Sequence, residues 1–268
     1  MEITHDLFTV DYGYIKKLTS NIKKPRYLFN EHQLNPGSQS MFRLNNTDTR
    51  SFVVINGNVV CESLQSDRTI VMKKYQQFEG WHAPPNSFFR MLNEGNKLAY
   101  VIEAGSINGQ DIDVNDISEL SEKPFNCIPL SQYHVTKPWG GETWFTQNMD
   151  NLPYALKKIF MTAGNFSSLQ SHEVKLETNY VIDGEATVLG GVTAPLDINA
   201  TIDIQKLSSQ NYPVGTGWSV DHRELHRVIA NTNYVAIEVS TPELDDVIRW
   251  QDKTKRSHGR IETEHRKI

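Results

Sequence analysis

One pattern of residues occurs twice in this chain, and this repeat constrains the fold more than any other feature. The first copy of the pattern is Gly37, Arg43, Asn45, Arg50 and Gly57, and the second is Gly164, Gln170, His172, Glu177 and Gly184, each 127 residues later. The flanking stretches agree as well, since F-V-V-I-N-G-N-V-V (52–60) corresponds to N-Y-V-I-D-G-E-A-T (179–187). Self-similarity at a fixed offset predicts two copies of one structural unit. We place them at residues 1–125 and 126–268.

The local pattern favours strands in both copies. Short stretches rich in Val, Ile, Phe and Tyr alternate with clusters of Gly, Pro, Asn and Asp, which is typical of a β-sandwich or β-barrel. Helical periodicity is weak and is confined to residues 6–20 and 115–122. The sequence therefore predicts an all-β protein with a few short helices.

The second copy carries side chains that suit a metal ion. Gln170 and His172 are two residues apart, so on a strand both leave the same face, and Glu177 can reach that face after a tight turn. His226 lies on a later apolar stretch. Two imidazoles with two oxygen donors suit a borderline divalent ion such as Zn²⁺, Mn²⁺ or Fe²⁺.

The first copy cannot bind a cation in the same way. Arg43 and Arg50 stand at two of its donor positions, and a guanidinium cannot ligate a positive ion. Phe89 corresponds to His226 in an approximate register. We expect a metal-free N-terminal copy.

Composition sets the wider limits. The chain has 268 residues and a net charge of −5, which argues against general nucleic-acid binding. No apolar run approaches the roughly 20 residues of a membrane helix, and the N-terminus does not resemble a signal peptide, so a cytoplasmic protein without membrane contact is expected. Cys61 and Cys127 match no disulfide framework and no metal spacing, and isolated buried thiols are expected.

These motifs resemble the cupin family. The pattern of the second copy is similar to the first cupin motif, G-x5-H-x-H-x3-4-E-x6-G, and Gly215 and His226 match the second motif, G-x5-P-x-G-x2-H-x3-N. In that motif Asp221 stands for Pro, Arg223 for Gly, and Asn231 lies one residue late. The resemblance implies two tandem cupin jelly-roll domains, of which the N-terminal one is degenerate.

Within cupins, the C-terminal half resembles the cupin domain of type II mannose-6-phosphate isomerases. The shared segments are K-P-W-G (137–140), S-L-Q-S-H (168–172), H-R-V (226–228) and D-D-V-I-R-W-Q-D (245–252). Where that family usually has Arg, this chain has Lys175. The resemblance implies a site of Gln170, His172, Glu177 and His226 that holds one divalent ion, with Zn expected and Fe, Mn or Ni as alternatives. It also implies interconversion of an aldose and a ketose.

Several charged residues near these motifs are candidates for catalysis. A base must move a proton between two substrate carbons, and the candidates are Glu173, Lys175, His222 and Glu224. Lys175 or Arg223 could instead bind a phosphate or carboxylate of the substrate.

Three functions therefore stay open. The first is a metal-dependent sugar or sugar-phosphate isomerase or epimerase in carbohydrate or cell-surface polysaccharide metabolism. The second is an Fe(II)-dependent dioxygenase, because His172, Glu177 and His226 could form a facial triad. The third is a sugar-binding protein without turnover. The expected partner is a small carbohydrate or sugar phosphate, and a homodimer that covers sheet edges is expected.

Overall fold

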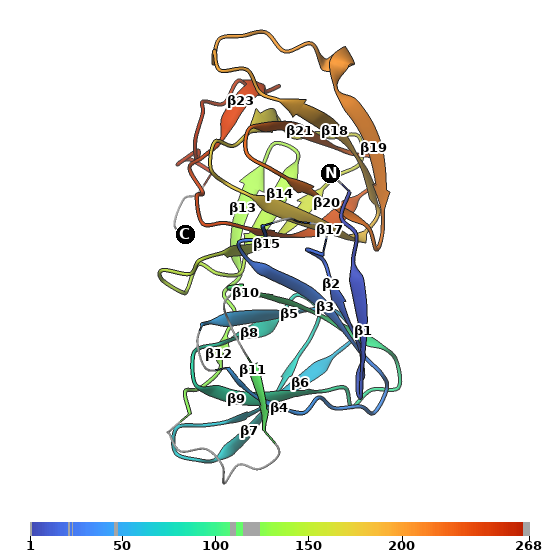
Figure 1. Cartoon of the computed structure of the whole chain (residues 1–268), viewed down its shortest axis with the longest axis vertical. Coiled ribbons are helices and arrows are strands. Elements are labelled where there is room, and N and C mark those ends of the chain that lie inside the picture. Colours follow the sequence, from blue (N-terminus) through green and yellow to red (C-terminus); the bar gives the residue numbers. More distant parts are fainter. Residues whose placement is uncertain are drawn as a thin grey trace. The chain divides into compact units, whose positions relative to one another are not determined.

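The computed structural model describes residues 2–20, 22, 24–45, 48–107, 111–114 and 124–264. Strands dominate this part of the chain, which also holds a short 3₁₀ turn, η2 (Ile204–Lys206). The chain divides into two compact units (Figure 1). The N-terminal unit comprises Thr4–Ser131 and Asn151–Tyr154, and the C-terminal unit comprises Met1–Ile3, Gln132–Asp150 and Ala155–Ile268.

The N-terminal unit is built from two sheets. One sheet has the order β1-β2-β3-β10-β5-β8-β12, and the other has the order β11-β4-β9-β6-β7. The strands are β1 (Asp6–Val10), β2 (Gly13–Lys17), β3 (Leu28–Leu34), β4 (Phe42–Asn45), β5 (Arg50–Asn56), β6 (Val59–Leu64), β7 (Ile70–Tyr75), β8 (Gly80–Ala83), β9 (Ser87–Leu92), β10 (Ala99–Gly105), β11 (Asp111–Val114) and β12 (Ile128–Pro129).

The C-terminal unit repeats this plan. Its sheets have the orders β13-β14-β15-β22-β17-β20 and β19-β18-β21-β16-β23. The strands are β13 (Tyr133–Lys137), β14 (Gly140–Trp144), β15 (Ala155–Met161), β16 (Leu169–Ser171), β17 (Glu177–Asp183), β18 (Glu185–Thr193), β19 (Ser208–Pro213), β20 (Gly217–Val220), β21 (Glu224–Ala230), β22 (Tyr234–Ser240) and β23 (Ile248–Gln251).

The strand register confirms the repeat. Arg43 pairs with Phe89 in the N-terminal unit, as Gln170 pairs with His226 in the C-terminal unit, so Phe89 does occupy the position of His226. The closing glycines also match in conformation, with φ of 79° at Gly57 and 68° at Gly184. A Cβ on Gly184 would lie 1.9 Å from a backbone oxygen, so this hairpin accepts no larger residue.

Aromatic side chains fill the space between the sheets of each unit. In the N-terminal unit, Phe52 stacks on Trp81 at 5.0 Å between ring centroids, and Phe89 packs edge-on against Phe52. In the C-terminal unit, Trp218 packs between Tyr212 and Tyr234. The position of Phe89 thus belongs to a hydrocarbon core in one unit and to a polar cavity in the other.

The structure corrects one of the two helices expected from the sequence and does not describe the other. The helix expected at residues 6–20 is wrong, because this segment forms the hairpin of β1 and β2 with Val10 paired to Gly13. The pairing of β2 with β3 along residues 13–17 outweighs the weak helical signal. The helix expected at 115–122 lies outside the described residues.

Both cysteines are free thiols, as expected, but only Cys61 is buried, whereas Cys127 is half-buried. They are not isolated from each other, because Cys127 packs against the buried cluster that contains Cys61. Burial, and then the neighbouring Cys127 thiol, raise the pKa of Cys61. In the described part of the chain no helix has the length and hydrophobicity needed to span a membrane.

Candidate metal centre

Three strands of the C-terminal unit bring the donor side chains together. Gln170 is the middle residue of the short strand β16 and pairs with His226 on β21. His172 follows β16 directly, and Glu177 is the first residue of β17 in the other sheet. The site therefore lies between the two sheets, where residues separated widely in the sequence meet.

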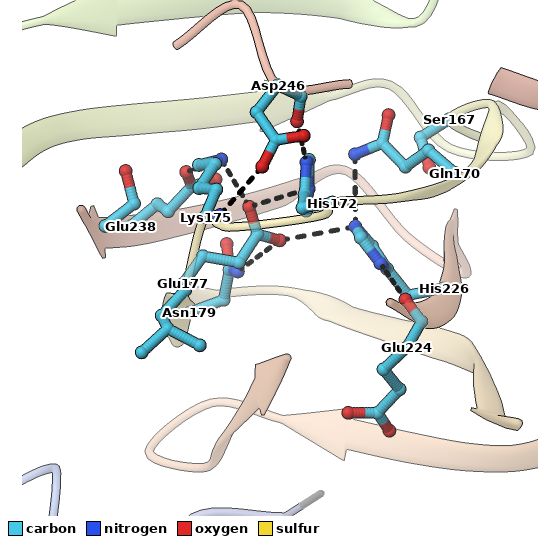
Figure 2. A network of polar contacts seen from close by, with 12 residues as sticks. Ser167, Gln170, His172, Lys175, Glu177, Asn179, Glu224, His226, Glu238 and Asp246 are labelled. Carbon is cyan, nitrogen blue, oxygen red and sulfur yellow. Dashed lines mark hydrogen bonds and ion pairs between the residues drawn. The ribbon is translucent and has the colours of Figure 1, made fainter. Parts of the chain in front are cut away.

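The donor atoms converge on one point (Figure 2). The Nε2 atom of His172 lies 3.5 Å from one carboxylate oxygen of Glu177, and Nε2 of His226 lies 3.4 Å from the other. One ligand atom from each of these three residues lies within 4.8 Å of the others. All three side chains are buried.

Backbone carbonyls orient both imidazoles. Nδ1 of His172 faces the carbonyl oxygen of Asp246, and Nδ1 of His226 faces that of Glu224 at 3.2 Å. A carbonyl only accepts, so each Nδ1 carries a proton, and each Nε2 is directed at Glu177. This is the arrangement by which outer-shell acceptors fix metal-ligating histidines.

Two further observations fit a bound cation. Nε2 of His172 is buried and has no hydrogen-bond partner among the residues that the structure describes. Burial lowers the pKa of His226 to about 4, although the Glu177 carboxylate opposes this shift. The imidazole of His226 is therefore neutral near pH 7, as a metal ligand must be.

Gln170 lies at the edge of the same site. Its amide nitrogen is 3.1 Å from Nε2 of His226, and its amide oxygen accepts a hydrogen bond from Ser168 at 2.9 Å. A rotation of the amide group exchanges the two atoms, and the Ser168 hydroxyl can accept as well as donate. Gln170 can thus present either a donor or an oxygen ligand to the site.

A row of buried charges of alternating sign leads away from Glu177. Lys175 lies 2.5 Å from Glu177 and 3.1 Å from Glu238. Lys157 lies 3.2 Å from Glu238 and 3.4 Å from Glu142. Burial lowers the pKa of Lys175, but the carboxylates of Glu177 and Glu238 outweigh burial and raise it, so the ammonium group stays charged.

The donors and these charges line a cavity of about 110 Å³. Lys175, Glu238 and Lys157 form part of its wall, and Arg249 lines it from the C-terminal segment. The guanidinium of Arg249 donates to the carbonyl oxygens of Ser257 and Gly259. The cavity wall therefore carries charges of both signs, and the Arg249 guanidinium on it contacts backbone carbonyls.

The other catalytic candidates from the sequence lie elsewhere. Glu173 is exposed and lies 3.6 Å from Arg223, whose guanidinium donates to the carbonyl of Ala194. His222 is also exposed, beside Asp221. Glu173, His222 and Arg223 do not belong to the cavity wall, whereas Lys175 does.

Sequence reasoning missed Glu238, Lys157 and Asp246. Glu238 and Lys157 occur within apolar strands, β22 and β15, where a charged residue is a signal of a buried polar site. Asp246 lies in the D-D-V-I-R-W-Q-D segment, whose sequence indicates a resemblance but no role for this residue. No local pattern indicates that its carbonyl would face His172.

In the N-terminal unit, cationic side chains occupy the region that corresponds to the metal centre, and they neutralise a buried carboxylate there. Glu103 on β10 occupies the position of Glu238 on β22, and Arg50 occupies the position of Glu177. Nη1 of Arg50 lies 2.6 Å from Glu103, and Nε2 of His32 lies 2.9 Å from it. A guanidinium thus stands beside the buried carboxylate in the copy that lacks the metal donors.

The comparisons with known proteins concern the fold. No family profile and no curated protein matches this sequence. Among solved structures, a Bacillus subtilis oxalate decarboxylase studied for its Mn(II) centres matches with a TM-score of 0.66 and 13% identity over 91% of this chain and 77% of that chain. The formate complex of Lactobacillus farciminis oxalate decarboxylase matches with a TM-score of 0.65 and 10% identity, over 91% of this chain and 86% of that one.

These structures, together with the repeated pair of sheets, define the fold class as that of a bicupin, with two tandem cupin domains. The chain therefore has the bicupin fold that its motifs predicted. Identities of this size establish the fold alone, so the chemistry must be argued from the site.

Proposed function

We propose that the C-terminal cupin binds one divalent metal ion and isomerises a small anionic sugar such as a sugar phosphate. The observation that carries the proposal is the convergence of two imidazoles and one carboxylate, with both Nδ1 atoms committed to carbonyls. Such a donor set suits Mn²⁺, Fe²⁺ or Zn²⁺. Mn²⁺ is the first ion to test, because the Bacillus subtilis protein of similar fold has Mn(II) centres.

The charge of the cavity wall supports an anionic substrate. Lys175 and Lys157 are each paired with two carboxylates, so the charge that favours an anion is that of Arg249, whose guanidinium faces backbone carbonyls. A divalent ion would add two further positive charges. Phosphate and carboxylate groups are the anions that such a wall binds best.

The chemistry requires one proton to move between neighbouring substrate carbons. A divalent ion in this site would polarise a substrate carbonyl and make the adjacent C–H more acidic. Lys175 stays protonated, so it can donate to a substrate oxygen but cannot serve as the base. Glu238 and Glu142 are the carboxylates of the cavity wall outside the donor set, and we take Glu238, which contacts Lys175, as the candidate base.

A second candidate is metal-dependent breakdown of a small dicarboxylate. It is favoured by the oxalate decarboxylases of similar fold and by the small size of the cavity. The Fe(II)-dependent dioxygenase and the sugar-binding protein without turnover are distinguished from both by their metal content and by oxygen uptake.

The test combines metal analysis with a substrate panel. Protein purified without chelator is expected to hold one divalent ion per chain, and His226→Ala and Glu177→Gln are expected to hold none. The metal-loaded protein is then assayed with hexose, pentose and heptose phosphates and with oxalate. Aldose–ketose conversion that is lost in both variants supports the isomerase. Release of CO₂ from oxalate supports the second candidate, and a wild-type protein without metal refutes both.

A further inference from the structure

Asp246 touches the loop of the metal centre with both its main chain and its side chain (Figure 2). Its carbonyl oxygen accepts a hydrogen bond from Nδ1 of His172. Its carboxylate accepts from three successive backbone N–H groups, at 2.9 Å from Glu173, 2.6 Å from Val174 and 2.8 Å from Lys175. One residue thus holds the whole stretch from His172 to Lys175.

That stretch needs an external acceptor. It connects β16 to β17, so its backbone lies outside the sheet ladders. Three consecutive N–H groups that point to one side form an anion-binding concavity, and charge-assisted bonds to a carboxylate are about twice as strong as neutral ones. Partial burial raises the pKa of Asp246, but the three backbone donors outweigh burial and lower it, so the carboxylate is ionised at neutral pH.

Asp246 belongs to the segment that follows β22 at the end of the C-terminal unit. Two residues later, β23 begins and pairs with β16, where Arg249 lies opposite Gln170. The same segment therefore contacts the site on two sides. It supports the strand that carries Gln170, and it fixes the loop that carries His172.

We propose that Asp246 is a positioning residue for the metal centre, through which the C-terminal segment controls metal affinity. The inference rests on the proposed function, because it assumes that His172 ligates an ion. The Asp246 carboxylate holds the loop in place, and the carbonyl then fixes the ring of His172 with Nε2 directed at Glu177. Loss of such an outer-shell partner weakens metal binding by about 10- to 100-fold in other proteins.

The experiment compares Asp246→Asn with Asp245→Asn. Asp245 is the neighbouring residue, and its carboxylate is exposed and pairs with Arg260 at 3.1 Å instead of with the loop. The affinity for Mn²⁺ is measured from the paramagnetic resonance signal of the free ion. D246N is expected to bind Mn²⁺ about 10- to 100-fold more weakly than the wild type, and D245N is expected to match the wild type.

A second measurement does not need the metal. In the presence of chelator, hydrogen exchange of the amides of residues 173–175 is expected to be faster in D246N than in D245N. Asp246→Ser removes the charge with a smaller side chain, is expected to give the same two results, and replaces D246N should that variant fail to fold.

The outcomes separate this inference from the proposed function. Wild-type affinity for Mn²⁺ in D246N would overturn the role of Asp246 and leave the metal centre intact. A wild-type protein that takes up no Mn²⁺ would refute the proposed function. In that case the exchange measurement still tests whether Asp246 holds the loop, since unchanged exchange in D246N would overturn that role as well.

Discussion

Glu103 allows a direct test of how much the buried ion pair with Arg50 stabilises the N-terminal unit. Its carboxylate is buried and contacts Arg50 at 2.6 Å, His32 at 2.9 Å and the amide of Asn30 at 3.1 Å. Burial raises the pKa of Glu103, but Arg50, His32 and Arg43 outweigh burial and hold it well below the usual range. The substitution Glu103→Gln keeps the shape and removes the negative charge that Arg50 contacts at 2.6 Å and Arg43 at 3.8 Å.

The expected loss is large. Removing one partner of a buried ion pair costs about 3–5 kcal/mol. The N-terminal unit has about 130 residues, and an unfolding entropy near 2.1 cal/mol/K per residue then gives a fall of about 11–18 °C in its unfolding temperature. Differential scanning calorimetry in the presence of chelator measures this shift.

The matched control is Glu94→Gln, the same chemical change at an exposed position of the same unit. It is expected to shift the unfolding temperature by no more than about 2 °C. An unfolding temperature of E103Q as close to the wild type as that of the control would refute the reasoning. It would mean that the arginines of this unit do not depend on the Glu103 carboxylate.

Two further predictions concern the C-terminal unit. Lys175→Met is expected to lower kcat for the isomerised substrate by about 100-fold or more, because Lys175 lines the cavity. Arg223 lies outside the cavity wall, so Arg223→Met is expected to keep the wild-type kcat. Equal kcat in both variants would contradict a role for Lys175 in catalysis. Burial raises the pKa of Glu142, but Lys157 and Lys137 outweigh burial and lower it from 4.5 to about 2. A carboxyl group whose pKa is lowered by folding stabilises the fold at pH values above its pKa in the unfolded chain, and this stabilisation is lost as the pH falls to the folded pKa. For Glu142, about 3 kcal/mol of the free energy of unfolding should therefore disappear between pH 4.5 and 2. Chemical denaturation in that range should show a shallower pH slope for Glu142→Gln than for the wild type.

Much of the fold could be predicted because its signals are local or repeated. The spacing from Gly164 to Gly184 is set by two short strands and their turns, and the first copy has the same spacing. The prediction of a helix at residues 6–20 was wrong because this segment has no strong local signal and no repeat. Its periodicity is short and weak, and the pairing of β2 with β3 decides its conformation.

The donor residues were also visible in the sequence, but their surroundings were not. His172 and Glu177 stand out because polar donors recur at motif spacing inside apolar strands. Proximity to the donors in the sequence favours Glu173 and His222 as catalytic candidates. Both are exposed, because neighbouring residues in a loop or strand point in different directions.

The sequence by itself determined that the chain contains two copies of one β unit and that the second copy carries the ligand-type side chains. Periodicity and residue type suffice for both, since they report on the local backbone and on chemistry. Only the tertiary structure decided that Lys175 lies between Glu177 and Glu238 and that the carbonyl of Asp246 faces His172. These contacts join residues up to 74 positions apart, and no local sequence pattern predicts the strand order that brings them together.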